Sequence, residues 1–536
     1  MVNKNGKTYS SIKLQEEFGL INEFTEISPS EFFYRNRDLA GFSNPSRALY
    51  SAVREFLENS LDACELHNIL PEIFVRLTPM DFDMNSQDPK AYMIKVQDNG
   101  SGIEPKYVPK AFGQVFFGSK FQLRQSRGMF GMGGTMAILY GQITTNKPVR
   151  ITTSVDGIHA FTFDLLIDVQ ENTPIILKKD SHPAEGSTGT MISLTLEGDY
   201  SRASQKILDY LKQIAMVTPY ANITFIDPYG RLFLYDRVTK IMPIPPKETL
   251  LHPYGTDVEA IRRMIKRSKQ NSMVKFMSKN FHRVGKNIAI KFLDYAGFDP
   301  NNDPKTLSND EITKLVRSLH RYDGFLQPDA SCLSPLGEEI LMTGIKKELE
   351  PEFTTATTRP PSAYSGFPFI VEVGLAYGGK ILPKGLKLFR FANRIPLLYD
   401  EANDVASKVL NEEIDWRRYR IPEDAPLAII THVCSTKIPY KTVGKEYLAD
   451  RPELERELKN AIREVLRKLS LYLSRKVSIE MDKRRFNTYG KYLPLIARFS
   501  KELSEAKRLP DYKKLLDRKM FQKDIEEYIN IKRLKN

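Results

Sequence analysis

The chain has 536 residues, of which 41% are hydrophobic and 10% are aromatic, a composition typical of a globular protein and not of a disordered one. A chain of this length exceeds a single hydrophobic core, so about three or four domains are expected. The formal net charge of +13 suits a nucleic-acid partner, provided that the positive charge is clustered.

The N-terminal segment, residues 1–23, is polar and mixed in charge, and we expect it either to be disordered or to pack on a partner. Residues 1–20 lack the apolar stretch of a secretory signal, and no run in the sequence approaches the roughly 18 apolar residues of a membrane span. The cysteines, at positions 64, 332 and 434, form no Cys-x-x-Cys pair, which indicates neither a zinc knuckle nor a disulfide framework. A reducing, cytoplasmic compartment and no membrane partner are therefore expected.

After a short helical segment at residues 31–37, an amphipathic helix is predicted around residues 53–65, with Asn44 and Pro45 as its cap and first turn. At about 100° per residue, Glu55, Asn59 and Asp62 share one side, because spacings of three and four return to the same face. The opposite side carries Leu49, Val53, Phe56, Leu57, Ser60 and Cys64. Taken alone, the polar stripe is more simply explained as a solvated surface than as a site.

Two strand-like segments, residues 73–77 and 92–97, follow this helix. The second leads into Asp98-x-Gly100-x-Gly102, in which an acid at a strand end precedes a tight turn that brings the backbone close to a ligand. An ordinary Asp-Gly turn is the simpler explanation when this pattern stands alone.

A glycine-rich segment, residues 127–137, contains four glycines ahead of an apolar helical run at residues 136–140. The N–H groups of such a segment, together with the helix N-terminus, form a phosphate cradle. Because no Gly-Lys-Ser/Thr closes it, the segment is not a Walker A loop, and a flexible glycine hinge is the alternative. Further on, Gly189-Thr190 enters a strand at residues 191–196 and offers a hydroxyl beside a ligand, although such a pair is often only a turn.

The four motifs occur in one order: Glu-x-x-x-Asn-x-x-Asp on a helix, Asp-x-Gly-x-Gly after a strand, a glycine-rich segment, and Gly-Thr before a strand. Together they resemble the nucleotide-binding domain of the GHKL ATPases over about residues 25–225. The resemblance implies an α/β sandwich with a mixed, largely antiparallel sheet under helices. It also implies ATP and Mg²⁺ as cofactors.

The same resemblance implies a role for each matching residue. Glu55 matches the general base that activates the attacking water, Asn59 the residue that holds Mg²⁺, and Asp98 the acceptor for the adenine amino group. Gly102 and Ile103 match the turn under the base, and Thr190 matches the hydroxyl near adenine. The remaining candidates for nucleotide binding are Ser119, Lys120, Gly128, Met129, Phe130, Gly131, Met132, Gly133, Gly134 and Thr135.

The middle of the chain, residues 254–300, reads as helical, and residues 260–291 contain ten Lys or Arg and no Asp or Glu. Such a run is usually a solvated face. An acid-free stretch in a chain with 27% charged residues nevertheless favours contact with the phosphate backbone of duplex DNA. Gly285 lies between helical segments in a pattern similar to a helix–two-turn–helix element. The candidate DNA-binding residues are Arg262, Arg263, Lys266, Arg267, Arg283 and Lys286.

The last third alternates strand-like segments, residues 367–375, 386–392 and 427–433, with helical ones, which indicates an α/β domain. The lysine-rich loop at residues 434–446 is, at face value, solvated. Apolar residues then recur at helical spacing over residues 452–477, which predicts a long helix whose stripe packs either on its own domain or on a partner. The remaining tail, residues 482–536, is basic and helical, and we expect interruptions at Pro494 and Pro510.

Segments at residues 28–33, 40–42, 53–63, 252–255, 368–372 and 434–446 make most of the chain similar to the B subunits of the type IIB DNA topoisomerases, an archaeal family. The resemblance implies an α+β multidomain protein: a strap or extension at 1–24, a GHKL ATPase domain at 25–245, a helix–two-turn–helix domain at 246–325, a transducer domain with a long C-terminal helix at 326–480, and a basic helical tail at 481–536.

The function implied by this second resemblance is an ATP-operated DNA gate. ATP-dependent homodimerisation would capture a duplex, and an A subunit in an A2B2 heterotetramer would make the break through which the duplex passes, so that DNA is relaxed and decatenated. Lys445, with Lys441 as the next candidate, matches the lysine that reaches the γ-phosphate. The protein would be cytoplasmic and nucleoid-associated. The alternatives are a GHKL ATPase of the mismatch-repair or chaperone type and a DNA-binding scaffold that does not hydrolyse nucleotide.

Overall fold

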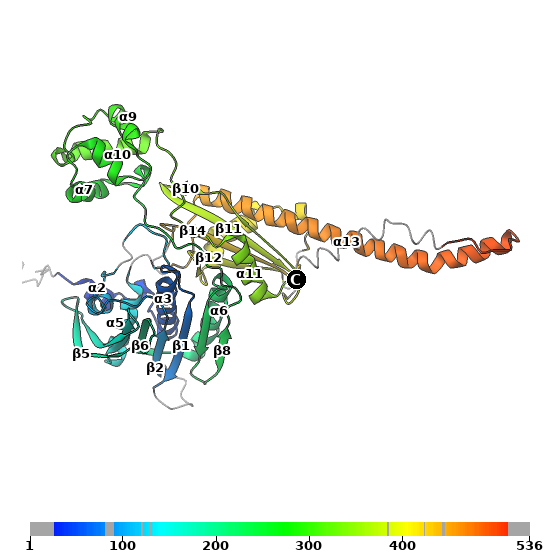
Figure 1. The fold of residues 1–536 in the computed structure, drawn as a ribbon, viewed down its shortest axis with the longest axis horizontal. Helices are drawn as coiled ribbons and strands as arrows, with labels where there is room; N and C mark the ends of the chain where they lie inside the picture. Colours follow the sequence, from blue (N-terminus) through cyan, green and yellow to red (C-terminus); the bar gives the residue numbers. More distant parts are fainter. Residues whose placement is uncertain are drawn as a thin grey trace, which may run out of the picture. The chain divides into compact units, whose positions relative to one another are not determined.

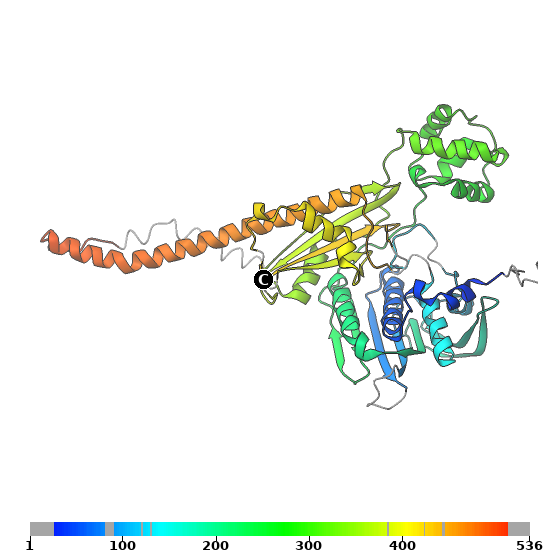
Figure 2. The same ribbon diagram turned by 180° about the vertical axis from the view of Figure 1, so that it is seen from behind.

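The computed structural model describes residues 26–80, 90–118, 122–128, 131–382, 385–422, 424–441 and 445–512. Contacts divide the chain into two compact units (Figures 1 and 2). Unit 1 comprises Met1–Lys212, Tyr220–Glu248 and Thr442–Lys445, and unit 2 comprises Gln213–Pro219, Thr249–Lys441 and Glu446–Asn536. The five-segment division made from the sequence stays a prediction, and its N-terminal segment lies outside the described residues.

Unit 1 is built on an eight-stranded sheet with the order β5-β4-β3-β6-β2-β1-β7-β8. Among the described strands, β1 pairs with β7 in parallel, and the other neighbours are antiparallel, which confirms the mixed, largely antiparallel sheet. The strands are β1 (Glu72–Pro79), β2 (Lys90–Gln97), β3 (Val149–Ser154), β4 (His159–Asp168), β5 (Thr173–Pro183), β6 (Gly189–Gly198), β7 (Asn222–Ile226) and β8 (Leu232–Tyr235).

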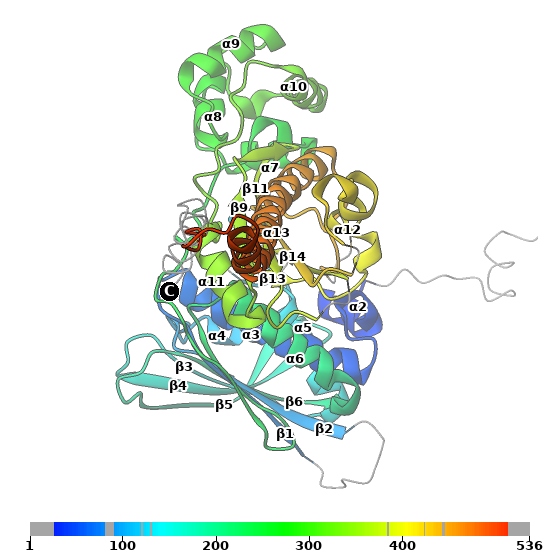
Figure 3. The ribbon, with the colours of Figure 1, turned by 90° about the vertical axis from the view of Figure 1, so that its right-hand side faces the viewer.

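Helices α3, α5 and α6 lie over one face of this sheet (Figure 3). The central one, α3, is capped as predicted, because the Asn44 side chain accepts a hydrogen bond from the Arg47 N–H at 2.9 Å and Pro45 occupies the first turn. Its apolar side is buried against the sheet, which fixes the rotation of the helix. The described α-helices of unit 1 are α2 (Pro29–Arg35), α3 (Pro45–Glu65), α4 (Val108–Gly113), α5 (Gly133–Thr145) and the part of α6 (Tyr200–Val217) that precedes Gln213.

In unit 2, a helical insert follows Thr249 and has its own core, in which Phe276, Phe292 and Leu315 are fully buried. Gly285 caps the start of α9 after the turn that follows α8, so the predicted glycine between helices is confirmed. The insert contains α7 (Val258–Arg267), α8 (Met273–Asn280), α9 (Lys286–Ala296) and α10 (Asn309–Arg321).

The remainder of unit 2 is a sheet with the order β10-β11-β14-β12-β13, to which β9 adds by pairing with β11. Helix α11 (Gly337–Leu349) packs on β9 and β11. Gly374 permits this approach, since a Cβ there would lie 2.4 Å from Ile345 Cδ1. The strands are β9 (Phe353–Thr358), β10 (Ser362–Tyr364), β11 (Phe367–Tyr377), β12 (Leu386–Ala392), β13 (Ile395–Pro396) and β14 (Leu427–Ser435), which confirms the α/β prediction.

The long helix α13 (Pro452–Leu503) has 52 residues. Its stripe is buried from Leu454 to Leu469 and packs on the sheet of its own unit. The expected interruption at Pro494 is wrong, because the helix continues through that residue; a proline removes one backbone hydrogen bond, which is a small part of what holds so long a helix. None of the helices in the described ranges is long and apolar enough to cross a membrane.

Candidate active site

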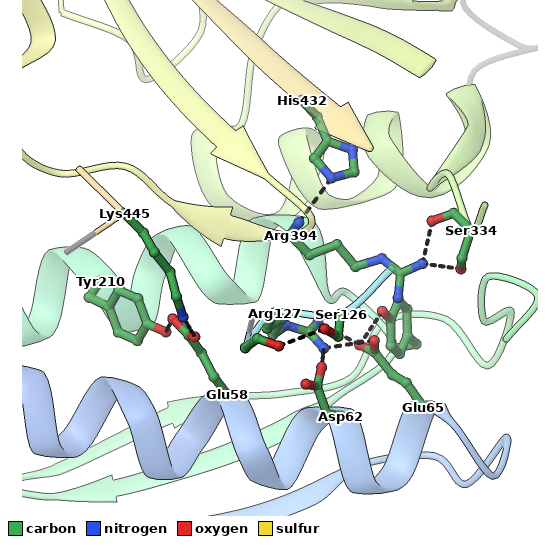
Figure 4. A network of polar contacts seen from close by, with 12 residues as sticks. Glu58, Asp62, Glu65, Ser126, Arg127, Tyr210, Ser334, Arg394, His432 and Lys445 are labelled. Carbon is green, nitrogen blue, oxygen red and sulfur yellow. Dashed lines mark hydrogen bonds and ion pairs between the residues drawn. The ribbon is translucent and has the colours of Figure 1, made fainter. Parts of the chain in front are cut away.

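The polar face of α3 is buried, so the solvated-surface explanation is wrong. Glu55 is 8% exposed, Glu58 1% and Asp62 7%, and Asn59 is half-buried. Buried carboxylates need partners, and these come from distant parts of the chain. Figure 4 shows the side chains of α3 pointing towards Lys445 and Arg127.

Glu55 and Asn59 lie against the N-terminus of α5, where the glycine-rich segment ends. A Cβ on Gly133 would lie 1.8 Å from Glu55 Oε2, and one on Gly134 would lie 3.3 Å from Asn59 Nδ2. Only glycine permits this approach at position 133. The first N–H groups of a helix favour an anion, so the structure brings together the predicted base, the predicted metal ligand and the last glycines of the predicted phosphate cradle.

Glu55 has a cationic partner that the sequence analysis missed. Arg54 Nη2 donates a hydrogen bond to Glu55 Oε1 at 2.7 Å, and Arg54 Nε lies 3.8 Å from Glu58 Oε1. Arg54 is buried. Arg54 directly precedes Glu55 in the sequence, but helical periodicity does not predict that its guanidinium group contacts the Glu55 carboxylate.

Lys445 reaches the same face from 387 residues further along the chain than Glu58. Its Nζ lies 3.3 Å from Glu58 Oε2 and 3.9 Å from Glu55 Oε1. Tyr210 Oη donates to Glu58 Oε1 at 3.1 Å. Burial raises the pKa of Glu58, and the neighbouring Lys445 acts in the opposite direction. Lys441, the second candidate, is exposed and lies over the ring of Tyr447.

Asp98 joins the end of β2 to the start of β6. Its carboxylate accepts hydrogen bonds from Ser60 Oγ at 2.8 Å, from the Gly100 N–H at 3.0 Å and from the Thr190 N–H at 3.1 Å. Burial raises the pKa of Asp98 above its usual value, and these three hydrogen bonds offset only part of that increase. Asp98 and Thr190 are thus brought together as predicted, while Ser60, assigned to the apolar side of the helix, contacts the candidate adenine acceptor.

The turn after Asp98 requires its second glycine. Gly102 has a φ of +67°, and a Cβ there would lie 2.1 Å from the Ser154 carbonyl oxygen. The Ile103 N–H donates to Thr153 Oγ1 at 2.8 Å. The turn is therefore held against β3, with Ile103 half-buried.

Asp62 lies on the same face of α3 as Glu55, but its contacts belong to a network around Arg127. Arg127, which is fully buried, donates to Asp62 Oδ1 at 3.0 Å and to both oxygens of Glu65 at 2.8 and 2.7 Å. Tyr220 Oη donates to Glu65 Oε1 at 2.6 Å. Since Arg127 directly precedes Gly128, this network ties the start of the glycine-rich segment to α3.

The other candidates for nucleotide binding divide into two groups. Thr135 and Met132 are buried at the start of α5, and Gly128 and Gly131 are half-buried. Four candidates lie outside the described residues, namely Ser119, Lys120, Met129 and Phe130.

The candidate DNA-binding residues lie on the surface of the helical insert. All ten basic residues of the acid-free stretch are exposed. Arg262 and Arg263 on α7 lie 3.7 and 3.6 Å from Glu259, which directly precedes that stretch. Arg283 Nη1 donates to the Gln327 carbonyl at 3.0 Å, and Lys286 is the first residue of α9.

A second buried polar cluster, Glu372, His432 and Cys434, has the residue types of a metal site in unit 2. However, His432 Nδ1 lies 2.8 Å from Glu372 Oε2, and its Nε2 accepts the Arg394 N–H at 3.0 Å (Figure 4). Glu372 also accepts from Leu336 N–H, Gly337 N–H and Thr358 Oγ1. Both imidazole nitrogens are engaged, so the cluster fits a hydrogen-bonded core better than a metal site.

Comparison with known proteins agrees with both resemblances. A family model described as "Topoisomerase VI B subunit, transducer" matches residues 328–485, and one described as "Histidine kinase-, DNA gyrase B-, and HSP90-like ATPase" matches residues 44–197. A Metallosphaera sedula protein, named as the B subunit of type 2 DNA topoisomerase 6, is 46% identical over 89% of this chain and 90% of its own length. A Saccharolobus solfataricus protein of the same name is 43% identical over 94% and 97%.

Proposed function

This chain belongs to the family of the type 2 DNA topoisomerase 6 B subunit, and on that premise we propose that it binds and hydrolyses ATP to operate a DNA gate. The observation that carries the proposal is the convergence on one face of α3 of Glu55, Asn59, the N-terminus of α5 and Lys445. Family membership also sets aside the chaperone and mismatch-repair alternatives.

We assign the hydrolytic step to Glu55, whose carboxylate can orient a water molecule and accept its proton. Arg54, which donates a hydrogen bond to Glu55, fixes the direction of that carboxylate. Asp98, held by three hydrogen bonds, would accept a hydrogen bond from the adenine amino group, with Gly102, Ile103 and Thr190 around the base.

The residues present fit Mg²⁺, a hard ion that prefers oxygen ligands and keeps few protein contacts when phosphates share it. The Asn59 amide oxygen would hold it, one turn after Glu55 on α3. When bound, the ion would offset negative charge on the phosphates. The N-terminus of α5 and Lys445 would supply the remaining positive potential, since loose phosphoryl-transfer transition states need several such groups.

We further propose that ATP favours association of two copies of this chain, because contacts made only in the closed state shift the equilibrium towards it. The pair would capture a duplex, and an A subunit would cut a second duplex within an A2B2 assembly. Lys445 would link the state of the nucleotide in unit 1 to the loop and the long helix that follow it in sequence.

The test is relaxation of negatively supercoiled plasmid by this chain with ATP, in the presence and absence of a candidate A subunit. Relaxation is expected only when both proteins and ATP are present. ATP hydrolysis by this chain alone should still be measurable, which separates the ATPase from strand passage. Relaxation that proceeds without the A subunit would contradict the two-subunit gate.

For the helical insert, we predict that changing Arg262, Arg263, Lys266 and Arg267 together to glutamine weakens duplex binding. The slope of log affinity against log salt is negative, and each lost phosphate contact reduces its magnitude by about 0.9. The slope should therefore become less steep by about 3 to 4. Binding of a labelled duplex is measured from about 50 to 200 mM salt. A charge-matched control changes four exposed basic residues elsewhere in the insert: Lys305, Lys314, Arg317 and Arg321. Equal slopes in the two variants would make α7 an ordinary solvated face.

A further inference from the structure

Glu58 and Lys445 form an ion pair in which both side chains are buried. Lys445 Nζ lies 3.3 Å from Glu58 Oε2, and Lys445 is only 7% exposed. The carboxylate is also fixed by the Tyr210 hydroxyl on α6 (Figure 4). Removing either partner of such a pair leaves a buried charge without compensation.

Four charges lie together here, and they divide into two pairs. Arg54 is closer to Glu55, at 2.7 Å, than to Glu58, at 3.8 Å. Lys445 is closer to Glu58, at 3.3 Å, than to Glu55, at 3.9 Å. The predicted base therefore has its own cation, and the lysine ammonium is held chiefly by Glu58, three residues further along the same helix face.

We infer that Glu58 is a positioning residue that holds Lys445 beside Glu55 and competes for its ammonium with the terminal phosphate of a nucleoside triphosphate. The inference rests on the proposed role of Lys445. Glu58 and a terminal phosphate both attract the same ammonium, so a shift of Lys445 Nζ towards the phosphate lengthens and weakens its contact with Glu58. A nucleoside diphosphate has no such phosphate and leaves the Glu58–Lys445 pair in place.

Glu58 thereby tunes discrimination between triphosphate and diphosphate. In the wild-type protein, triphosphate binding must separate a buried, charge-assisted contact, which weakens its affinity. Diphosphate binding carries no such cost. The burial that raises the pKa of Glu58 acts in the same direction, because a carboxylate that loses Lys445 in this environment is destabilised as an anion.

The first experiment is Glu58→Gln, which keeps the shape of the side chain and an acceptor for Tyr210 but removes the charge. Binding of a non-hydrolysable ATP analogue is expected to become about tenfold tighter, while ADP affinity stays unchanged; both are measured by calorimetry. Glu171→Gln, in the exposed turn before β5, is the matched control and should leave both affinities unchanged. An unchanged or weaker affinity for the analogue, or an equal change for ADP, would overturn the inference.

The second experiment reads the pair directly, without nucleotide. Lysine reactivity towards reductive methylation is followed by mass spectrometry, and Lys445 should react about tenfold faster in Glu58→Gln than in the wild-type protein, because a charge-assisted contact is lost. Other lysines serve as internal references, and a thermal melt confirms that the variant is folded. Equal Lys445 rates in the two proteins would overturn the inference.

Lys445→Met separates this inference from the function on which it rests. If this variant binds the analogue and hydrolyses ATP as the wild type does, the proposed role of Lys445 fails. If it loses analogue affinity while Glu58→Gln behaves as the wild type, only the role of Glu58 fails. In the double variant, the effect of Glu58→Gln on analogue affinity should disappear, because its competitor is gone.

Discussion

Replacing Glu55 with glutamine is expected to reduce ATP hydrolysis by about 10²- to 10⁴-fold, the usual contribution of a positioned general base. The amide has nearly the same shape, and it still fits beside Gly133. It can also accept the hydrogen bond from Arg54, but it cannot accept a proton from water. Nucleotide binding should therefore survive. Single-turnover hydrolysis and binding of a non-hydrolysable ATP analogue are the two measurements.

The pattern of these two measurements discriminates between the remaining functions. Loss of turnover with retained binding supports Glu55 as the base. Hydrolysis at the wild-type rate in the variant would refute that role. A wild-type protein that binds the analogue but shows no turnover above the Glu55→Gln background, even with the A subunit and DNA, would favour the non-hydrolysing scaffold.

Replacing Arg127 with methionine is expected to destabilise unit 1 by about 3–5 kcal/mol, the usual cost of removing one partner from a buried ion pair. The substitution keeps much of the side-chain volume but leaves the carboxylates of Asp62 and Glu65 without their cation. Denaturant unfolding followed by circular dichroism provides the measurement. The variant should also bind the ATP analogue more weakly, because Arg127 ties the glycine-rich segment to α3.

Arg150→Met is the matched control for this prediction. Arg150 also makes a two-pronged contact with a carboxylate, Asp164, at 2.8 and 2.9 Å, but its side chain is largely exposed. Exposed pairs contribute about 0–1 kcal/mol, so the control should unfold almost as the wild type does. A cost for Arg127→Met no larger than that of the control would show that the network does not support unit 1.

Local signals predicted much of this architecture because the features concerned depend on neighbours in the chain. The cap of α3, the strand before Asp98 and the glycines ahead of α5 all depend on short-range geometry, and each was found where the sequence placed it. The resemblance to known families supplied the predicted order of the domains and the proposed roles of Glu55, Asn59 and Asp98, which residue spacing alone could not supply.

The burial of the polar face of α3 could not be predicted from its periodicity. A stripe of acids has the same pattern whether water or a distant cation faces it. Here Lys445 and Arg127 are the cations that face the stripe, and Tyr210 on α6 donates a hydrogen bond to Glu58. Glu58 gave no signal in the sequence because it stands outside the spacing Glu55–Asn59–Asp62. The expected interruption at Pro494 is wrong because the rule that proline breaks a helix considers only neighbouring residues. The long helix α13 tolerates the loss of one backbone hydrogen bond.

Because α13 is one continuous helix, a small tilt at its buried end would move its far end by a larger distance. At 1.5 Å per residue, 52 residues span about 78 Å. The buried stripe clamps the helix as far as Leu469, and the remaining 34 or so residues, about 50 Å by the same rise, are mostly exposed. By simple trigonometry on that length, a tilt of about 5° at the clamp moves the far end by about 4 Å. A small rearrangement among the β-strands that pack on the buried part of α13 would therefore become a larger displacement at the far end, and Pro494, which lacks one backbone hydrogen bond, lies within the exposed part of the helix.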